Sequence, residues 1–421
     1  MKKVIYPLLC LSFVYIMTSC TKDFGSVTVN YTKATAIYDN LNEVRSIPLI
    51  GVNRTIDNPG KIFVADKVLL IGEEGKGIHI IDNSDPANPT PMQFMNIPGG
   101  REYYVEGDFL YAESYYDMLK IDISNPYTPK LTSRIENAFA QEFTNEAGDI
   151  LVGFEYEQVT EQLEEGTDFY EQFYGSNEIY YYDYADRLIP PSAVPASFAG
   201  TSNNGIGAVN RIAYQEGYVY VISRSYMTIF KDETDLSFVS TNAVGWQMET
   251  IFPHKGKMFV GTQNSMEIFD VSNPEQPQGI ASFWHATSCD PVYPVEDVAY
   301  ITLRTGDVTN CPGDENSLTV LDISNITNPV TAQEIEMESP YGLTLANARL
   351  YVGEGENGLK IFDATDKMNL TLETFDQSIE AYDVIHHPTN TNILLVAGPN
   401  GLGQYEIDGE ERLTLVSWLN M

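Results

Sequence analysis

The chain is 421 residues long, with 43% hydrophobic and 12% aromatic residues and a formal net charge of −35 at pH 7. This length allows two or three average domains or one large repeat domain, and the composition is that of a folded protein rather than a disordered one. Because nucleic-acid binders need a basic surface, the acidic balance excludes that class of partner and predicts a surface that repels polyanions.

The N-terminus has the layout of a secretory signal. Two lysines precede an apolar run from Val4 to Met17, which is too short to cross a membrane, and the sequence MTSC follows, ending at Cys20. Small residues before a cysteine resemble a bacterial lipobox, although Met17 stands where leucine is usual. We therefore expect residues 1–19 to be a lipoprotein signal peptide and Cys20 to carry the lipid. An ordinary signal peptide with a chance cysteine is the alternative.

Residues 20–45 show little hydrophobic periodicity and are predicted to be a tether behind the lipidated cysteine. The membrane would then be contacted through the lipid anchor alone. Lys22-Asp23 resembles the surface-export signal of Bacteroidetes lipoproteins. This favours the outer membrane, on its surface-exposed face or, alternatively, its periplasmic face.

An eight-residue motif recurs along the chain: DNSDPANP from Asp82, DISNPYTP from Asp122, DVSNPEQP from Asp270 and DISNITNP from Asp322. Each copy follows two β-branched or aromatic runs that are separated by a loop, which indicates a hairpin, and each precedes another strand-like run. An Asp or Asn side chain can accept from backbone N–H groups two residues on, and proline can end one strand and begin an edge strand. These acids are therefore predicted to form turns and not a catalytic site.

The ends of the second runs recur roughly every 40 to 60 residues, with no convincing amphipathic helix between them. They fall at Asp82, Asp122, Asp183, Lys231, Asp270, Asp322, Asp363 and Asp408. Such a period, with four strands per unit, is typical of a propeller blade. We predict an all-β fold in which residues 46–421 form a single β-propeller of eight four-stranded blades. Seven blades are the alternative, and EVRSIPLI, from Glu43, is either a strand that helps to close the ring or part of the tether.

These units resemble the LVIVD repeat, as the runs GLKIFDATD, MEIFDVSNPEQP and SLTVLDISNITNP illustrate. From about Gly60 to the C-terminus, the chain is similar to LVIVD-repeat β-propeller lipoproteins of the Bacteroidetes type. The resemblance implies a propeller in a secreted or lipid-anchored protein, and it supplies no catalytic residues. Function has to be argued from the site, because a shared fold does not supply one.

Two units are enlarged, by residues 155–184 and by residues 304–316, both predicted to lie between the second and third strands of a blade. Long loops in compact domains are often functional, so we expect the face that carries them to be the binding face. Tyr170 and Tyr174 in the first insertion are candidates for stacking on a sugar or for a protein interface. Burial in the core is the alternative.

The exits of the second strands hold a further set of ligand-binding candidates. We expect these residues to surround the mouth of the central channel and to bind a cation or a polar ligand, unless they are simply solvated loop ends. The set is Glu73, Glu113, Arg224, Thr262 and Glu354.

Cys289 and Cys311 are candidates for a disulfide, because an exported protein meets an oxidising compartment; two separate thiols are the alternative. No cofactor is expected. The loop that holds Asp307, Asn310, Asp314, Glu315 and Asn316 offers oxygen ligands suited to calcium without the spacing of an EF-hand, so calcium remains an alternative there.

The sequence favours a lipid-anchored, non-catalytic binding or interaction module of the cell envelope. Its partner would be an outer-membrane protein or a glycan. The alternative is a carbohydrate-active enzyme that uses carboxylates at the channel mouth. An enzyme of that kind needs two acids from different blades within reach of one substrate, whereas a binding module needs only an exposed patch.

Overall fold

A computed structural model describes residues 26–139, 144–164, 179–182, 188–189, 211–223, 225–245, 248–262, 264–284, 292–305, 316–408 and 412–421. The chain forms two compact units. One unit comprises residues 1–38 and 151–199, and the other comprises residues 39–150 and 200–421.

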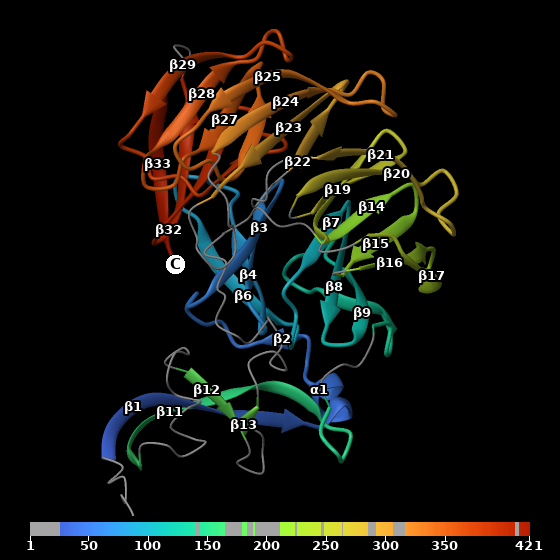
Figure 1. Ribbon diagram of the computed structural model, residues 1–421, viewed down its shortest axis with the longest axis vertical. Helices are drawn as coiled ribbons and strands as arrows, with labels where there is room; N and C mark the ends of the chain where they lie inside the picture. Colours follow the sequence, from blue (N-terminus) through green and yellow to red (C-terminus); the bar gives the residue numbers. More distant parts are fainter. Residues whose placement is uncertain are drawn as a thin grey trace, which may run out of the picture. The chain divides into compact units, whose positions relative to one another are not determined.

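In its described part, the larger unit is a β-propeller of seven four-stranded antiparallel blades, whose strands pair in chain order (Figure 1). Blades 1 to 4 consist of β3 (Pro59–Ala65), β4 (Val68–Glu73), β5 (Gly77–Asp82) and β6 (Thr90–Asn96); β7 (Tyr103–Glu106), β8 (Phe109–Ser114), β9 (Asp117–Asp122) and β10 (Lys130–Ile135); β14 (Ile212–Gln215), β15 (Tyr218–Ile222), β16 (Tyr226–Asp232) and β17 (Leu236–Ala243); and β18 (Met248–His254), β19 (Lys257–Thr262), β20 (Ser265–Asp270) and β21 (Gln278–Trp284). Blades 5 to 7 consist of β22 (Val292–Val295), β23 (Val298–Leu303), β24 (Ser317–Asp322) and β25 (Val330–Glu336); β26 (Leu343–Ala346), β27 (Arg349–Gly353), β28 (Leu359–Asp363) and β29 (Thr371–Asp376); and β30 (Asp383–His386), β31 (Ile393–Gly398), β32 (Gly401–Ile407) and β33 (Leu413–Asn420).

The prediction of eight blades is wrong, and the seven-blade alternative is confirmed. The third sequence unit does not form a blade. Its strands β11 (Ile150–Glu164), β12 (Ile179–Tyr182) and β13 (Leu188–Ile189) join β1 (Ser26–Asp39) in a separate sheet of order β11-β1-β12-β13. β12 pairs with β1 in parallel, with Thr32 opposite Ile179, so the partner of β12 comes from the far N-terminal part of the chain.

The predicted domain boundaries change accordingly. The range 20–45, predicted to be a tether, contains β1 and most of the helix α1 (Leu41–Ser46), and the range 151–199 lies outside the propeller unit. EVRSIPLI does not close the ring. It contributes the end of α1 and β2 (Ile50–Gly51), which pairs with β6 as a fifth strand of blade 1. Arg45 on α1 binds Asp117 of blade 2 through two hydrogen bonds of 2.8 and 2.6 Å.

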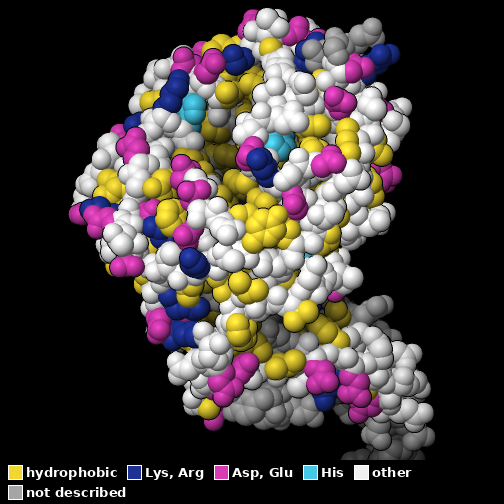
Figure 2. Space-filling view, turned by 180° about the vertical axis from the view of Figure 1, so that it is seen from behind, with side chains coloured by type: hydrophobic (Ala, Val, Ile, Leu, Met, Phe, Trp, Pro, Cys, Tyr) yellow, Lys and Arg dark blue, Asp and Glu magenta, His cyan; other side chains and the backbone are white. Residues whose placement is uncertain are grey.

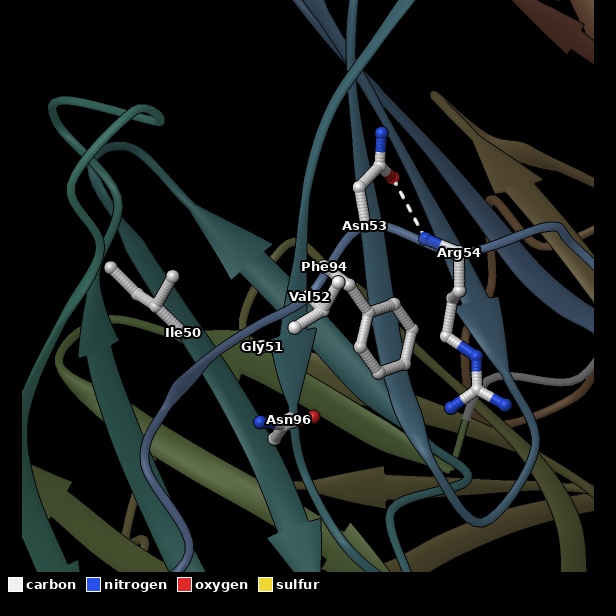
Figure 3. Close-up of a pocket in the computed structure, with 7 residues that line it drawn as sticks. All are labelled: Ile50, Gly51, Val52, Asn53, Arg54, Phe94 and Asn96. Atoms are coloured by element: carbon white, nitrogen blue, oxygen red, sulfur yellow. Dashed lines mark hydrogen bonds between the residues drawn. The ribbon is translucent and has the colours of Figure 1, made fainter.

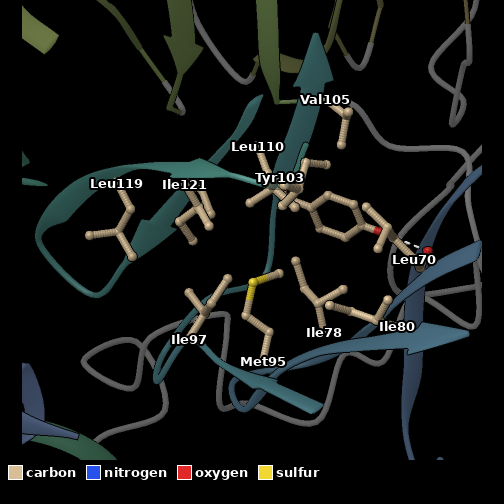
Figure 4. Close-up of a cluster of buried hydrophobic side chains, with 12 residues drawn as sticks. Leu70, Ile78, Ile80, Met95, Ile97, Tyr103, Val105, Leu110, Leu119 and Ile121 are labelled. Carbon is tan, nitrogen blue, oxygen red and sulfur yellow. Dashed lines mark hydrogen bonds between the residues drawn. The ribbon is translucent and has the colours of Figure 1, made fainter. Parts of the chain in front are cut away.

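The core lies between neighbouring blades, which is why the second and third strands are apolar on both faces. Between blades 1 and 2, for example, Leu70, Ile80 and Met95 pack against Leu110 and other side chains of the next blade (Figure 4). The Tyr103 hydroxyl lies within this cluster, 2.8 Å from the Lys61 carbonyl oxygen and 2.7 Å from the Leu70 carbonyl oxygen, and shares its single proton between these two acceptors. Its hydrogen bonds satisfy a polar group in an otherwise apolar interface.

The recurring turn has the predicted structure. The Asp that ends a third strand accepts from the backbone N–H two residues on, at 2.8 to 2.9 Å, in the pairs Asp82–Ser84, Asp122–Ser124, Asp270–Ser272, Asp322–Ser324 and Asp363–Thr365. These hydrogen bonds lower the pKa of each carboxyl, because they favour its charged form. The acids are partly exposed turn formers on separate blades and do not form a common site.

Each fourth strand carries a bulge against its third strand. At four of these bulges a polar side chain forms a hydrogen bond with the backbone of the next blade, near the start of its fourth strand. The pairs, side chain first and backbone second, are Gln93–Pro126, Ser133–Leu236, Gln333–Leu370 and Ser417–Pro86. The last pair joins blade 7 to blade 1, which lie side by side in Figure 1. Buried Asn83 and Gln404 also exchange two hydrogen bonds, of 3.0 and 2.7 Å, so side chains rather than a shared strand close the ring.

Candidate functional site

Charged residues gather at one register position of the first strands, several of which contact the first strand of the next blade. In each blade, a fixed position of the first strand pairs with an apolar residue of the second strand. Examples are Ile62 with Ile71 and Tyr103 with Ala112. The residue just before that position is Lys61 in blade 1, Glu102 in blade 2, Arg211 in blade 3, Thr250 in blade 4, Gly342 in blade 6 and Asp383 in blade 7. We call Asp383, Lys61, Glu102 and Arg211 the charged arc.

The signs alternate along the charged arc as it passes from blade 7 through blades 1 and 2 to blade 3. The charge of Lys61 acts on both neighbouring carboxylates, Asp383 and Glu102, and Glu102 also faces Arg211, whose backbone N–H it accepts from. Lys61 is 9% exposed and Asp383 is 5% exposed. Near its centre the propeller is hollowed, with hydrophobic side chains inside and charged ones around the rim (Figure 2).

Burial shifts the titration of this arc. It raises the pKa of Glu102 to about 7 and that of Asp383 to about 7, although the Lys61 charge opposes both shifts. Burial also lowers the pKa of Lys61, against the pull of the two carboxylates. Carboxyls that titrate near neutrality can give up or take a proton at physiological pH, which makes this arc the chemically distinctive part of the propeller.

The charged arc could have been found in the sequence from the position of its residues relative to the first strands. Each member stands directly before the apolar run of a first strand, in GKIFV, REYYV, NRIAY and AYDVI. The ends of the second strands carry a different set of acids, which includes Glu73 and Glu354.

Glu73 does lie at the end of a second strand, but its side chain is fully buried and partnered within blade 1. Its carboxylate lies 2.6 Å from Lys76 Nζ, 2.7 Å from His79 Nε2 and 3.5 Å from Arg54 Nε. Burial lowers the pKa of His79, although Glu73 favours its charged form. A carboxylate held in this way stabilises its own blade and is not presented to a ligand in the channel.

Glu354 is the same case in blade 6. Its side chain is fully buried, lies 2.7 Å from Lys360 Nζ and accepts from the backbone N–H of Ser339 at 2.6 Å. Lys360 occupies the register position of His79, because each pairs with the equivalent residue of its second strand. Two blades thus use one arrangement, a buried carboxylate with a base on the next strand. Thr262, the equivalent residue of blade 4, binds Ser265 in its own turn.

Glu113 is one residue out of register with Glu73. Ser114 is the true equivalent, because Ser114 pairs with Asp117 as Glu73 pairs with Gly77. A shift of one residue turns a side chain to the other face of a strand. Half-buried Glu113 therefore lies near Arg211 and Arg101, and burial raises its pKa despite both cations. It flanks the charged arc rather than belonging to a ring with Glu73 and Glu354.

The remaining candidates lie outside the described residues: Cys20, Tyr170, Tyr174, Arg224, Cys289 and Cys311. Most of the proposed calcium loop lies outside them too. Asn316, at its end, uses its side-chain oxygen to accept from the backbone N–H of Thr305 at 2.8 Å. Among the residues with described positions, no three His, Cys, Asp or Glu side chains form a group that could hold a metal ion.

Of the two insertions, only residues 304–316 lie between the second and third strands of a blade; residues 155–184 belong to the other compact unit, so the prediction is wrong for the first insertion. We define the insertion face as the end where second strands finish, third strands begin and each blade passes to the next. The loop 304–316 joins β23 to β24 there, and the chain leaves the propeller from the same end after β10, where the Phe139 N–H donates to the Tyr116 carbonyl. Trp284, at the end of β21, is 70% exposed, and Tyr226, at the start of β16, is 52% exposed.

A smaller aromatic group lies on the insertion face between blades 5 and 7. Tyr341 and Tyr382 meet edge to face with ring centroids 5.0 Å apart, and the Arg304 guanidinium lies 4.2 Å from the Tyr341 ring centre. Each tyrosine directly precedes a register position described above, Gly342 or Asp383. The group therefore borders the channel on the side of Asp383.

A recess of about 670 Å³ lies beside β2 (Figure 3). It is lined by Ile50, Gly51, Val52, Asn53, Arg54, Phe94 and Asn96. Its one charged side chain, Arg54, lies over the Phe94 ring at 5.2 Å and already contacts Glu73. The recess thus offers an apolar wall and no pair of titratable groups, so it is the weaker candidate for chemistry.

Within the described part of the chain, no helix combines the length and the apolar composition needed to cross a membrane.

The chain carries LVIVD repeats, matched at residues 60–96, 102–136, 258–283 and 312–335. No curated protein sequence matches it. Among solved structures, it is similar to the periplasmic gluconolactonase of Pseudomonas aeruginosa, with 10% identity over 84% of this chain and 96% of that one and a TM-score of 0.52. It is also similar to Sqt1 of Saccharomyces cerevisiae, with 9% identity over 93% and 89% and a TM-score of 0.52. At these identities the likeness concerns the fold alone.

Proposed function

We propose that this LVIVD-repeat propeller is a lipid-anchored, non-catalytic interaction module of the outer membrane, and that it binds a protein partner through its insertion face. The signal-like N-terminus and Cys20 support the anchor. Seven blades form the scaffold, and the loop 304–316 joins two of its strands at the insertion face. Loops on a rigid scaffold are the usual carriers of binding function.

The observation that carries the proposal is the exposure of large aromatic side chains on the insertion face. Trp284 is 70% exposed and Tyr226 is 52% exposed, on neighbouring blades. Tryptophan and tyrosine are enriched in the buried centres of protein interfaces, because they combine a large apolar area with one polar group. Exposing so much of such side chains to water is costly, so they favour a partner that covers them.

Site-specific photo-crosslinking tests the proposal in living cells. A photoreactive amino acid replaces Trp284 in one variant and Tyr127 in the control; Tyr127 is 59% exposed but lies in a turn at the opposite end of the propeller. We expect a discrete crosslinked protein from position 284 only. Equal products from both positions, or none from either, would contradict the proposal. A crosslinked product removed by glycosidases would assign the face to a glycan.

A carbohydrate-active enzyme remains the second candidate, and one observation favours it. Glu102 and Asp383 come from different blades, and the charge of Lys61 acts on both of these carboxyls, whose pKa values are about 7. Hydrolysis of a panel of chromogenic glycosides by the wild-type protein, lost in both Glu102→Gln and Asp383→Asn, would support this function over simple binding.

A further inference from the structure

We infer that the charged arc is a binding site for one uncharged, hydroxyl-rich molecule, of the class of a neutral sugar or polyol, which bridges Lys61 and Glu102. This inference goes beyond the proposed function, because it concerns a small ligand in the channel and not the partner on the insertion face. It holds whether the site only retains the ligand or also acts on it.

The first argument is hydrogen-bonding capacity that the protein leaves unused. Lys61 Nζ and Glu102 Oε2 are both buried, and neither has a hydrogen-bond partner among the described residues. The Lys61 residue as a whole is 9% exposed, and its Nζ atom is itself buried. Buried polar atoms are nearly always hydrogen-bonded, since leaving one unpaired is unfavourable. A donor and an acceptor left open on adjacent blades at one register position therefore indicate a ligand that supplies both counterparts.

The second argument is the alternation of charge. Along Asp383, Lys61, Glu102 and Arg211 every neighbour has the opposite formal sign, and the arc is balanced as a whole once both carboxyls are ionised, above about pH 7. An anion drawn to Lys61 would meet the two carboxylates that flank it, and a cation drawn to Glu102 would meet Lys61 and Arg211. A hydroxyl group avoids this conflict, because it accepts from an ammonium group and donates to a carboxylate. The site thus selects against net charge in its ligand.

The third argument is the shape of the channel wall around the arc. At the same register position blade 4 carries Thr250, whose short side chain takes little space. The Tyr341–Tyr382 pair borders the arc next to Asp383, and both rings are half-buried. Aromatic faces beside hydrogen-bonding groups are the surroundings that suit a sugar ring, since its C–H face is apolar and its edge is polar.

Isothermal titration calorimetry of the full mature chain tests the inference with three probes: glucose, its anionic relative gluconate and its cationic relative glucosamine. Galactose, mannose and N-acetylglucosamine extend the neutral set. Lys61→Met removes the donor and keeps an apolar stem of similar length. Lys67→Met, at an exposed lysine of the same blade, is the matched control. Circular dichroism confirms that each variant is folded.

We expect at least one neutral sugar to bind, with gluconate and glucosamine weaker by about tenfold or more, because each meets a like charge in the arc. Lys61→Met should weaken the neutral sugar by about 10-fold to 100-fold, whereas Lys67→Met should leave it unchanged. Glu102→Gln, which keeps an acceptor, should weaken it less than Glu102→Leu does. Binding of none of the neutral sugars, preferential binding of a charged probe, or equal affinity of Lys61→Met and wild type would each overturn the inference.

These outcomes are separate from those of the photo-crosslinking test. A partner crosslinked at position 284 without any sugar binding would retain the interaction module and remove the channel site. Sugar binding without a crosslinked partner would retain the channel site and remove the interaction module.

Discussion

The carboxylate of Asp383 lies where a side chain on Gly342 would begin. A Cβ atom on Gly342 would be 1.8 Å from Asp383 Oδ1, far inside van der Waals contact. The two residues hold the same register position on adjacent blades, so the absence of a side chain in blade 6 is what lets Asp383 enter the charged arc. Asp383 Oδ1 also accepts from the backbone N–H of Val384 at 2.9 Å, which fixes its orientation.

Gly342→Ala is therefore expected to destabilise the propeller by about 1 to 3 kcal/mol, because Asp383 or its blade must move to make room. Urea denaturation measures the loss. Gly279→Ala is the control, since a Cβ atom there meets only Phe269 at an ordinary 3.7 Å. If both variants were as stable as the wild type, the packing of Asp383 against Gly342 would be wrong.

Stability should depend on pH through the same carboxyl. Burial raises the pKa of Asp383 from 3.8 to about 7, so the folded protein holds a proton that the unfolded chain releases near pH 4. The stability that this proton contributes is fully present below the pKa of Asp383 in the unfolded chain. It is lost as the pH rises through the pKa of Asp383 in the folded protein. Asp383→Asn should remove this dependence, making the variant gain roughly 3 kcal/mol relative to wild type between about pH 5 and about pH 8.

Urea denaturation of both proteins at the two pH values provides the measurement, and exposed Asp297→Asn is the control. A constant difference in unfolding free energy between Asp383→Asn and wild type across this range would show that Asp383 titrates like an ordinary surface acid.

Glu354 should matter for stability rather than for ligand binding. Glu354→Gln leaves the Lys360 ammonium with Glu338 alone in a largely buried place, so we expect a loss of roughly 2 to 4 kcal/mol. Exposed Glu356→Gln, two residues away, should have no effect beyond about 0.5 kcal/mol. The double variant Glu354→Met with Lys360→Met should recover most of the loss, and failure to recover would argue against the pair as its cause.

The side-chain contacts that join blade 7 to blade 1 are expected to stabilise the propeller as much as the contacts between other neighbouring blades. Gln404→Leu leaves buried Asn83 without its partner between blades 7 and 1, and should cost about 1 to 3 kcal/mol. Gln333→Leu removes the corresponding support between blades 5 and 6, where Gln333 binds both backbone groups of Leu370. Equal losses in urea are predicted. A far larger loss for Gln404→Leu, with a second unfolding transition, would mean that blade 7 is held mainly by this pair.

The features that could be predicted from the sequence are those made by residues close together in the chain. The turn at Asp322 needs only the N–H of Ser324, two residues on, and so it is visible as a motif. The separate sheet could not be predicted in this way, because the partner of Ile179 is Thr32 and periodicity does not encode which strand pairs with which. A unit of repeat-like sequence was therefore counted as a blade.

The geometry around Glu73, Glu113 and Glu354 could not be predicted for a related reason. The turn after β4 has three residues and the turn after β8 has two, so counting along the chain placed Glu113 beside Glu73 although their side chains face opposite ways. The burial of these acids could not be predicted either. The sequence suggests that Glu73 and Glu354 are exposed, but each is buried against a basic residue of the next strand. The charged arc emerges only when first strands are aligned by their pairing.

Hydrogen exchange of the protein, free and with its crosslink-identified partner, tests the central claim most directly. The account predicts slower exchange in the complex on the insertion face, around Tyr116, Tyr226 and Trp284. It predicts no change in the turns at the opposite end, such as those that follow Asp82 and Asp322. Protection confined to those turns, with none on the insertion face, would contradict it.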